Sequence, residues 1–282
     1  MKLGGRRTSS NVEDRRGRSV GGKAVAGGGI ATLVIAVVVM LLGGDPSQVM
    51  GPAADTMPGP MGPAEPRPAA EDALANFASV ILADTEDTWP DLLSPLGVRY
   101  QEPGMVLFTG AVDSGCGFAQ SAMGPFYCPA DQRVYLDVGF FGELEREFQA
   151  PGDFAAAYVI AHEVGHHVQT LLGISARVDA ARRSVSEVEA NALSVRQELQ
   201  ADCFAGIWAH HAQVERQLLE AGDVEEGLRA AAAIGDDTLQ RRAQGRVVPE
   251  SFTHGSAEQR VAWFKRGLDT GSLKACDTFG AE

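Results

Sequence analysis

The hydrophobic and polar positions divide the chain into a long uncharged run near its start and a mixed region after it. Residues 24–44 (AVAGGGIATLVIAVVVMLLGG) contain no charged side chain. About 20 apolar residues are enough for a helix to cross the hydrocarbon core of a bilayer. The run is longer than the apolar core of about 7–15 residues in a cleaved signal peptide, which is the alternative interpretation. The pattern therefore predicts a transmembrane helix at residues 24–44.

The region after this run alternates between helical and extended patterns. Apolar residues recur at helical spacing over 71–90, and Pro90 stands where that helix should end. Two stretches, 105–112 and 126–138, read as strands of a small sheet, the second with a turn at 129–131. Further helices are expected at about 153–172, 183–220, 223–243 and 256–270, with Asp153 as a candidate N-cap and Gly173 as a candidate C-cap. The pattern predicts an α+β fold in which helices dominate.

Charge and proline content give the expected order of segments. Residues 1–23 carry seven Lys and Arg against two acidic residues, and the positive-inside bias places such an arm in the cytoplasm. Residues 45–70 hold seven prolines among Gly and Ala, the composition of an extended linker. We therefore expect a single-pass membrane protein with a cytoplasmic basic arm, an N-terminal membrane helix and a linker. The domain at 71–282 would be extracytoplasmic, either periplasmic or at the cell surface.

The overall charge excludes one class of partner. The net charge is −13 at pH 7, and because the first 23 residues are basic, the remainder is more acidic still. An acidic body repels polyanions and lacks the basic surface that nucleic acid requires. We expect no nucleic-acid partner, and the sequence does not indicate an oligomeric state.

The four cysteines all lie on the side assigned to the oxidising compartment. They are Cys116, Cys128, Cys203 and Cys276. An even number in that setting favours two disulfides, and four cysteines allow three pairings. We favour Cys116–Cys128, which closes a short loop, with Cys203–Cys276, which ties a helix to the C-terminal tail. Free buried thiols are the alternative. Zinc ligation by cysteine is disfavoured because the chain has no CxxC pair.

A candidate metal site begins in the sequence HEVGHH at residues 162–167. His162 and His166 are one helical turn apart on the same face, a spacing that lets two imidazoles bind one Zn²⁺. Glu163 would point to the open side of the metal, where it can take a proton from water. The surrounding helix is apolar, so burying these side chains without a partner would be unfavourable. The segment therefore predicts one Zn²⁺ per chain, with Glu163 as the catalytic base.

A third ligand is expected on a later helix. Glu198 and Asp202 are one turn apart among apolar neighbours, and buried carboxylates need a partner. We assign Glu198 as the third ligand and Asp202 as the acceptor for the far N–H of His162, which would fix the orientation of that ring. An exposed acidic helix face is the alternative, and it fits Glu187 and Glu189 better.

HExxH followed by ExxxD resembles the gluzincin class of metallopeptidases. More narrowly, the chain is similar to the family of membrane-anchored bacterial proteins described as "putative neutral zinc metallopeptidases". This similarity rests on the N-terminal apolar run and on four segments, residues 114–137, 162–169, 198–206 and 251–268. The resemblance implies a zincin-like fold in which the active-site helix packs against a small sheet. It also implies a protein or peptide substrate.

Residues 252–255 (FTHG) resemble a Thr-His-Pro segment of membrane-associated gluzincins, with Gly255 in place of the proline. The resemblance makes His254 a candidate donor to the oxyanion of the reaction. A capping role at the start of the following helix is the alternative. Tyr158 is a weaker candidate for the same donor, because core packing explains its position on the apolar helix.

Three further features have structural explanations that compete with functional ones. His167 projects about 100° from His166 on a helix, so we expect a structural role. We expect His210 and His211 on an exposed helix surface. Residues 133–137 (RVYLD) are either an edge strand to which a peptide adds or plain sheet core.

The sequence therefore predicts a zinc-dependent endopeptidase for extracytoplasmic or membrane-proximal proteins. Zinc would polarise the substrate carbonyl and activate water, and Glu163 would move the proton to the leaving amine. Two alternatives stay open. One is a non-catalytic membrane scaffold in which zinc only ties two helices together. The other is a hydrolase of a non-peptide amide.

Overall fold

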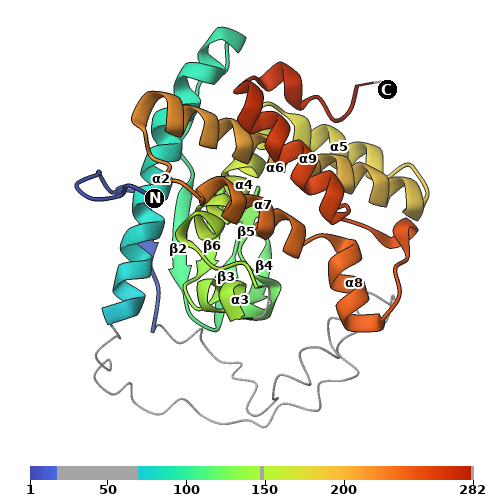
Figure 1. Cartoon of the computed structure of the whole chain (residues 1–282). Coiled ribbons are helices and arrows are strands. Elements are labelled where there is room, and N and C mark those ends of the chain that lie inside the picture. The colour runs from blue at the N-terminus through green and yellow to red at the C-terminus, as the bar shows by residue number, and fades with distance from the viewer. Residues whose placement is uncertain (18–68, 147–148, 281–282) are drawn as a thin grey trace.

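The computed structural model describes residues 1–17, 69–146 and 149–280 and shows a mostly helical α+β fold (Figure 1). The helices are α2 (Ala69–Leu93), α3 (Phe140–Arg146), α4 (Asp153–Leu171), α5 (Ile174–Arg182), α6 (Glu187–Arg216), α7 (Asp223–Ala233), α8 (Asp236–Gln244) and α9 (Ala257–Thr270). The strands are β1 (Val12–Asp14), β2 (Gly104–Phe108), β3 (Ala111–Ser114), β4 (Gly117–Gln120), β5 (Phe126–Cys128) and β6 (Arg133–Asp137). The predicted fold class, helices with a small sheet, is confirmed for these residues.

The larger sheet has the strand order β1-β2-β6-β5, and β3 and β4 form a separate hairpin. β1, β2 and β6 are parallel, whereas β5 runs antiparallel to β6. Because β6 is paired on both sides, the idea that residues 133–137 form an edge strand is wrong. The alternative is correct, since Val134 and Leu136 are fully buried.

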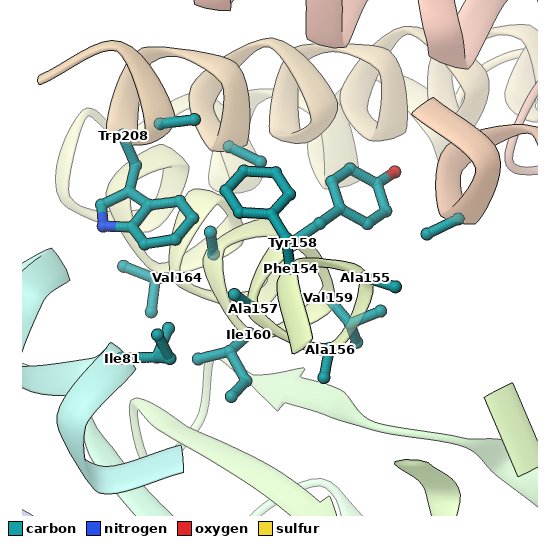
Figure 2. Packing of buried hydrophobic residues seen from close by; sticks show 14 of the residues in the cluster. Ile81, Phe154, Ala155, Ala156, Ala157, Tyr158, Val159, Ile160, Val164 and Trp208 are labelled. Atoms are coloured by element: carbon teal, nitrogen blue, oxygen red, sulfur yellow. The ribbon is translucent and has the colours of Figure 1, made fainter. Parts of the chain in front are cut away.

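Helix α4 lies between the sheet and α6, and this position explains its almost entirely apolar sequence. Figure 2 shows Phe154 and Tyr158 pointing towards the helix that carries Trp208, while Ile160 points towards the sheet. The rings of Phe154 and Trp208 stack with centroids 5.9 Å apart. A helix buried on all sides needs apolar residues all round, so the histidines of α4 stand out in the core.

Helices α6 and α9 approach until their backbones touch. A Cβ atom on Gly206 would lie 2.1 Å from the carbonyl oxygen of Phe264, and one on Gly267 would lie 1.9 Å from that of Cys203. Both glycines therefore permit a contact that no larger residue allows. The close approach brings the first turns of α9 beside the part of α6 that carries Glu198 and Asp202.

Both predicted disulfides are present. Cys116 bonds to Cys128, and Cys203 bonds to Cys276 in the short helical turn η5 (Leu273–Cys276). The alternative of free buried thiols is wrong. One bridge ties the β3–β4 hairpin to β5, and the other ties α6 to the C-terminal turn.

The N-terminal arm, residues 1–17, is part of the domain. Val12 in β1 pairs with Met105 in β2. The guanidinium group of Arg7 donates to Glu86 at 2.8 Å, and that of the buried Arg16 donates to Asp72 at 2.9 Å. A strand paired with β2 cannot lie across a bilayer from it. The predicted topology, with a cytoplasmic arm and an extracytoplasmic domain, is therefore wrong.

The predicted transmembrane helix at 24–44 and most of the linker at 45–70 lie outside the described residues. Among the residues that are described, no helix combines the length and the apolar character needed to cross a membrane. A transmembrane helix before the domain is thus not supported, and the prediction of a single-pass membrane protein is corrected.

Some helix ends differ from the sequence pattern. Helix α2 continues through Pro90 to Leu93. Proline costs the helix one hydrogen bond, but Trp89 and Leu93 are fully buried, and their packing holds the last turn in place. Asp153 is not the N-cap of α4, since Gly152 holds that position. The single helix expected at 223–243 is divided into α7 and α8 near Gly235, where a Cβ atom would meet Ala257 N at 2.3 Å.

Candidate metal centre

Helices α4 and α6 bring three potential metal ligands together. Each of His162, His166 and Glu198 offers one ligand atom, and these atoms lie within 4.8 Å of one another. Nε2 of His162 is 3.1 Å from Oε2 of Glu198, and Nε2 of His166 is 3.4 Å from Oε1. A tetrahedral zinc site with bonds near 2.0–2.1 Å has ligand atoms about 3.3 Å apart. The two nitrogen-to-oxygen distances in the cluster are close to that value.

The ring of His162 is oriented from behind by Asp202. Nδ1 of His162 lies 2.9 Å from Oδ1 of Asp202, so the Nδ1–H group donates to the carboxylate. In the neutral ring, Nε2 then carries the lone pair, and it faces Glu198. The far nitrogen of a zinc-bound histidine commonly has such a carboxylate partner.

The ring of His166 is oriented in the same way by an amide. Nδ1 of His166 lies 2.9 Å from Oε1 of Gln169, an oxygen that only accepts. In the neutral ring, Nε2 of His166 therefore also presents a lone pair to Glu198. Two nitrogen lone pairs facing one partly buried carboxylate need a cation between them. Imidazole nitrogen and carboxylate oxygen are common zinc ligands, so the residues present fit Zn²⁺.

The charges in this cluster support one another. Burial opposes the charged form of His162, but Asp202 and Glu198 outweigh this effect and raise its pKa to about 10. Burial would raise the pKa of Glu198, yet His166 and His162 hold it well below its usual value. In the absence of a metal, protons thus take the place of the cation, and metal binding would release them.

Asp202 is itself held by a buried arginine that the sequence analysis missed. Nε of Arg260 lies 2.9 Å from Oδ2 of Asp202, and Nη2 lies 3.0 Å from Oδ1. Burial would raise the pKa of Asp202, but Arg260 and His162 lower it, so the residue stays ionised. A signal was present, because Arg260, Phe264 and Gly267 share one face of α9 at helical spacing, and all three are buried. An arginine on an apolar face needs a buried anion.

Glu163 lies beside the ligands in α4 and is 8% exposed. Burial raises its pKa, and the nearby His162 and His166 oppose this shift. A hydrogen bond from the backbone of Tyr127 in β5 also favours the carboxylate. Glu163 therefore lies beside the edge strand β5 on one side and the ligand cluster on the other.

Comparison with known proteins bears on the chemistry of this cluster. A model of the family described as "Putative neutral zinc metallopeptidase" matches residues 1–279. The chain belongs to this family. The name of the family implies zinc and peptidase activity. The match includes the N-terminal arm, which agrees with the packing of the arm on the domain.

The chain is also similar to two proteins from named bacteria. It is 49% identical to "Uncharacterized protein YpfJ" of Escherichia coli K12 over 99% of both chains. It is 46% identical to "Uncharacterized protein Rv2575" of Mycobacterium tuberculosis H37Rv, with 66% of each chain covered. No solved structure matches the chain.

His254 lies in a loop shaped by Asp236. The backbone N–H groups of Thr253, His254 and Gly255 all donate to Oδ2 of Asp236, at 2.7–3.0 Å. The His254 side chain is 52% exposed, and although partial desolvation opposes its charged form, Asp236 and Glu198 raise its pKa. The N-cap of α9 is Ser256, so the capping role considered for His254 is wrong. Its role as an oxyanion donor stays a prediction.

Tyr158 and His167 both make contacts inside the domain. The hydroxyl of the fully buried Tyr158 donates to Oδ1 of Asp202 and is not available to a substrate. His167 is also fully buried, with Nε2 2.6 Å from the carbonyl oxygen of Gln101 and Nδ1 3.0 Å from the hydroxyl of Tyr127. Both residues have structural roles, as their positions in the apolar helix indicate.

His210 and His211 are not simply surface residues. Nδ1 of His210 lies 2.7 Å from the carbonyl oxygen of Leu268, and Nε2 of His211 lies 3.1 Å from that of Gly271. Both side chains are half-buried. They tie α6 to the end of α9, because the last carbonyls of a helix need donors.

A second group of acidic side chains has a different partner. Asp153, Asp223 and Glu226 come together at the starts of α4 and α7. The α-amino group of Met1 lies 2.8 Å from Asp153 and 3.5 Å from Asp223. This cluster therefore anchors the N-terminal arm through an ammonium group of its own chain.

Proposed function

We propose that the chain is a zinc-dependent endopeptidase that hydrolyses peptide bonds in protein or peptide substrates. The observation that carries the proposal is the convergence of two Nε2 lone pairs and the Glu198 carboxylate, with Glu163 beside them. Among the described residues, this group supplies three protein ligands. Three protein ligands are typical of catalytic zinc sites, whereas structural sites usually have four.

Each residue has a part in the proposed reaction. His162, His166 and Glu198 would bind the metal. Zinc, when bound, would polarise the substrate carbonyl and make a water molecule more acidic. The Glu163 carboxylate would take a proton from the attacking water and pass it to the nitrogen of the leaving amine. The raised pKa of Glu163 suits this role. The carboxylate must bind the proton from water firmly enough to carry it, before it gives the proton to the amine.

His254 would act on the developing charge. Hydrolysis of an amide builds negative charge on the carbonyl oxygen, and a positioned donor stabilises it. In support of this role, Glu198 raises the pKa of His254, and Asp236 holds the loop that carries it. Removing such a donor typically lowers kcat by about 10²–10³-fold.

The deciding experiment compares the parent protein with Glu163→Gln and Glu198→Ala. We expect the parent to bind one zinc per chain and to cleave casein. Glu163→Gln should keep zinc and lose about 10²–10⁴-fold in cleavage rate, whereas Glu198→Ala should lose zinc. Equal cleavage by Glu163→Gln and the parent would remove Glu163 from the mechanism. A zinc-loaded, folded parent that cleaves no peptide bond would favour a structural zinc site or a non-peptide amide as substrate.

A further inference from the structure

A line of buried hydrogen bonds, the Gln169 relay, runs from His166 to the C-terminal turn. Nδ1 of His166 is 2.9 Å from Oε1 of Gln169, and Nε2 of Gln169 is 3.1 Å from Oε1 of Gln200. Nε2 of Gln200 is 2.9 Å from the backbone oxygen of Cys276. Nε2 of Gln169 also donates to the backbone oxygen of Gln197, at 2.7 Å. Gln169 is 0% exposed and Gln200 is 5% exposed.

The two backbone carbonyls fix the direction of every bond in this line. A carbonyl oxygen only accepts, so the amide nitrogen of Gln200 must face Cys276 and its amide oxygen must face Gln169. By the same reasoning, the amide nitrogen of Gln169 faces Gln197 and Gln200. Its oxygen is then left for His166, whose Nδ1 must carry the hydrogen. The opposite arrangement would place two oxygens or two N–H groups against each other in a buried site.

We propose that Gln169 and Gln200 are positioning residues that hold His166 with a free Nε2 towards the metal. The proposal rests on the proposed function only in taking His166 as a ligand. It makes the C-terminal turn part of the metal centre, because the Cys276 carbonyl sets the direction of both amides. The disulfide to Cys203 holds that carbonyl beside α6, one turn from Gln200.

The relay gives His166 a different type of hydrogen-bond acceptor from the one behind His162. Asp202 gives His162 a charged acceptor that is balanced by Arg260, whereas His166 receives a neutral amide acceptor. A neutral acceptor orients a ring without adding charge to a cluster that already contains Glu198 and Glu163. The two histidines are thus positioned by separate groups, and each can be tested without the other.

The test uses Gln→Met substitutions, which keep the length of the side chain and remove its hydrogen bonds. Gln169→Met should raise the zinc dissociation constant about 10–100-fold, as expected for loss of a partner behind a ligand. Gln200→Met should raise it less. The double variant should be no worse than Gln169→Met alone, because Gln200 acts through Gln169. Zinc affinity is measured by competition with a chelator.

Gln197→Met is the matched control. It lies on the same helix and keeps its backbone carbonyl in the relay, while its amide donates to the hydroxyl of Ser175 at a long 3.4 Å. Its zinc affinity should stay within about twofold of the parent, as for a surface change of up to about 0.5 kcal/mol. The unfolding midpoints of all zinc-free variants are measured as well, so that a loss of stability is separated from a loss of affinity.

A nuclear magnetic resonance measurement reports on the ring directly. In the zinc-loaded parent labelled with ¹⁵N-histidine, the Nδ1–H signal of His166 should be protected from exchange with water. In Gln169→Met that signal should shift and exchange faster, while the Nδ1–H signal of His162 should not change. A general loosening of the fold would alter both signals, and that result would contradict the proposal.

The outcomes separate this proposal from the proposed function. If Gln169→Met binds zinc like the parent while His166→Ala loses zinc, the relay is refuted and the ligand set stands. If His166→Ala also binds zinc like the parent, the ligand set itself fails. Should Gln169→Met not fold, Gln200→Met decides the matter, and an unchanged zinc affinity in that variant refutes the relay.

Discussion

Arg260 of α9 and Asp202 of α6 form an ion pair that is excluded from water. Two guanidinium nitrogens contact the two carboxylate oxygens at 2.9 and 3.0 Å, and the side chains are 3% and 0% exposed. The pair stands directly behind His162, since Asp202 accepts from its Nδ1. The orientation of one proposed ligand thus depends on a residue that is distant in sequence.

Asp202→Asn should destabilise the zinc-free protein by about 3–5 kcal/mol. The substitution leaves the Arg260 charge buried without a counter-ion, and removing one partner of a buried pair destabilises a fold more than replacing both partners. Urea denaturation measures the loss, with the exposed Glu187→Gln on the same helix as control. The double variant Asp202→Asn with Arg260→Met should recover part of the loss. A loss below about 1 kcal/mol would mean that water reaches the pair.

Gly267→Ala should destabilise the protein by about 1–3 kcal/mol or more, because the added methyl group meets backbone rather than a movable side chain. The new Cβ would lie 1.9 Å from the Cys203 carbonyl oxygen. Moving α9 away from α6 would also shift Arg260, so zinc affinity should fall. Gly4→Ala is the control, since nothing lies within 4 Å of its Cβ position. Equal denaturation curves for the two variants would show that the helices separate easily.

Loss of the two disulfides should have unequal effects. The bridges close loops with sequence separations of 73 and 12 residues, and chain entropy assigns them about 4 and about 3 kcal/mol respectively. Replacing Cys203 and Cys276 by serine should also weaken zinc binding, because the Cys276 carbonyl ends the relay behind His166. Replacing Cys116 and Cys128 should leave zinc affinity unchanged. Denaturation and chelator competition on both double variants test this difference.

The docking of the N-terminal arm should depend on pH through Glu13. Hydrogen bonds from Arg15 and, to a smaller extent, from Arg133 lower the pKa of Glu13 from 4.5 to about 2. A carboxyl with a lowered pKa stabilises the fold above its ordinary pKa, and this contribution disappears as the pH falls from about 4.5 to about 2. Glu13→Gln should therefore lower the thermal midpoint at pH 6, and the deficit should shrink in acid. A deficit that is constant with pH, or equal to that of the exposed Glu250→Gln, would contradict this assignment.

The ligand cluster could be predicted from the sequence because residues four apart on a helix lie on the same face. His162 and His166 must share a face, and the apolar residues around Glu198 and Asp202 indicate that these carboxylates face the interior, where Asp202 is fully and Glu198 partly buried. The partner of His166 could also have been found, since Gln169 lies three residues on, on the same face. Arg260 was harder to assign, because its sequence shows that the charge is buried but does not show which anion it meets.

The N-terminal arm shows where sequence reasoning failed and why. A basic segment before an apolar run suggested a cytoplasmic tail, yet the acidic Glu13 and Asp14 pair with Arg15 and Arg16 beside them. Such mixed charges can form a polar edge strand, and composition does not separate the two outcomes. The partner strand β2 is nearly a hundred residues away, so no local sequence pattern predicts the pairing.

The position of β1 has a consequence for the order in which the chain can fold during synthesis. Glu13 in the arm reaches Arg133, 120 residues later in the chain. At about 5–20 residues per second, the ribosome needs on the order of ten seconds to supply that partner. The strand that is made first thus stays unpaired until β2 and β6 have been made. Charged side chains oppose pairing of an exposed strand with another chain, and the arm carries several of them during this wait.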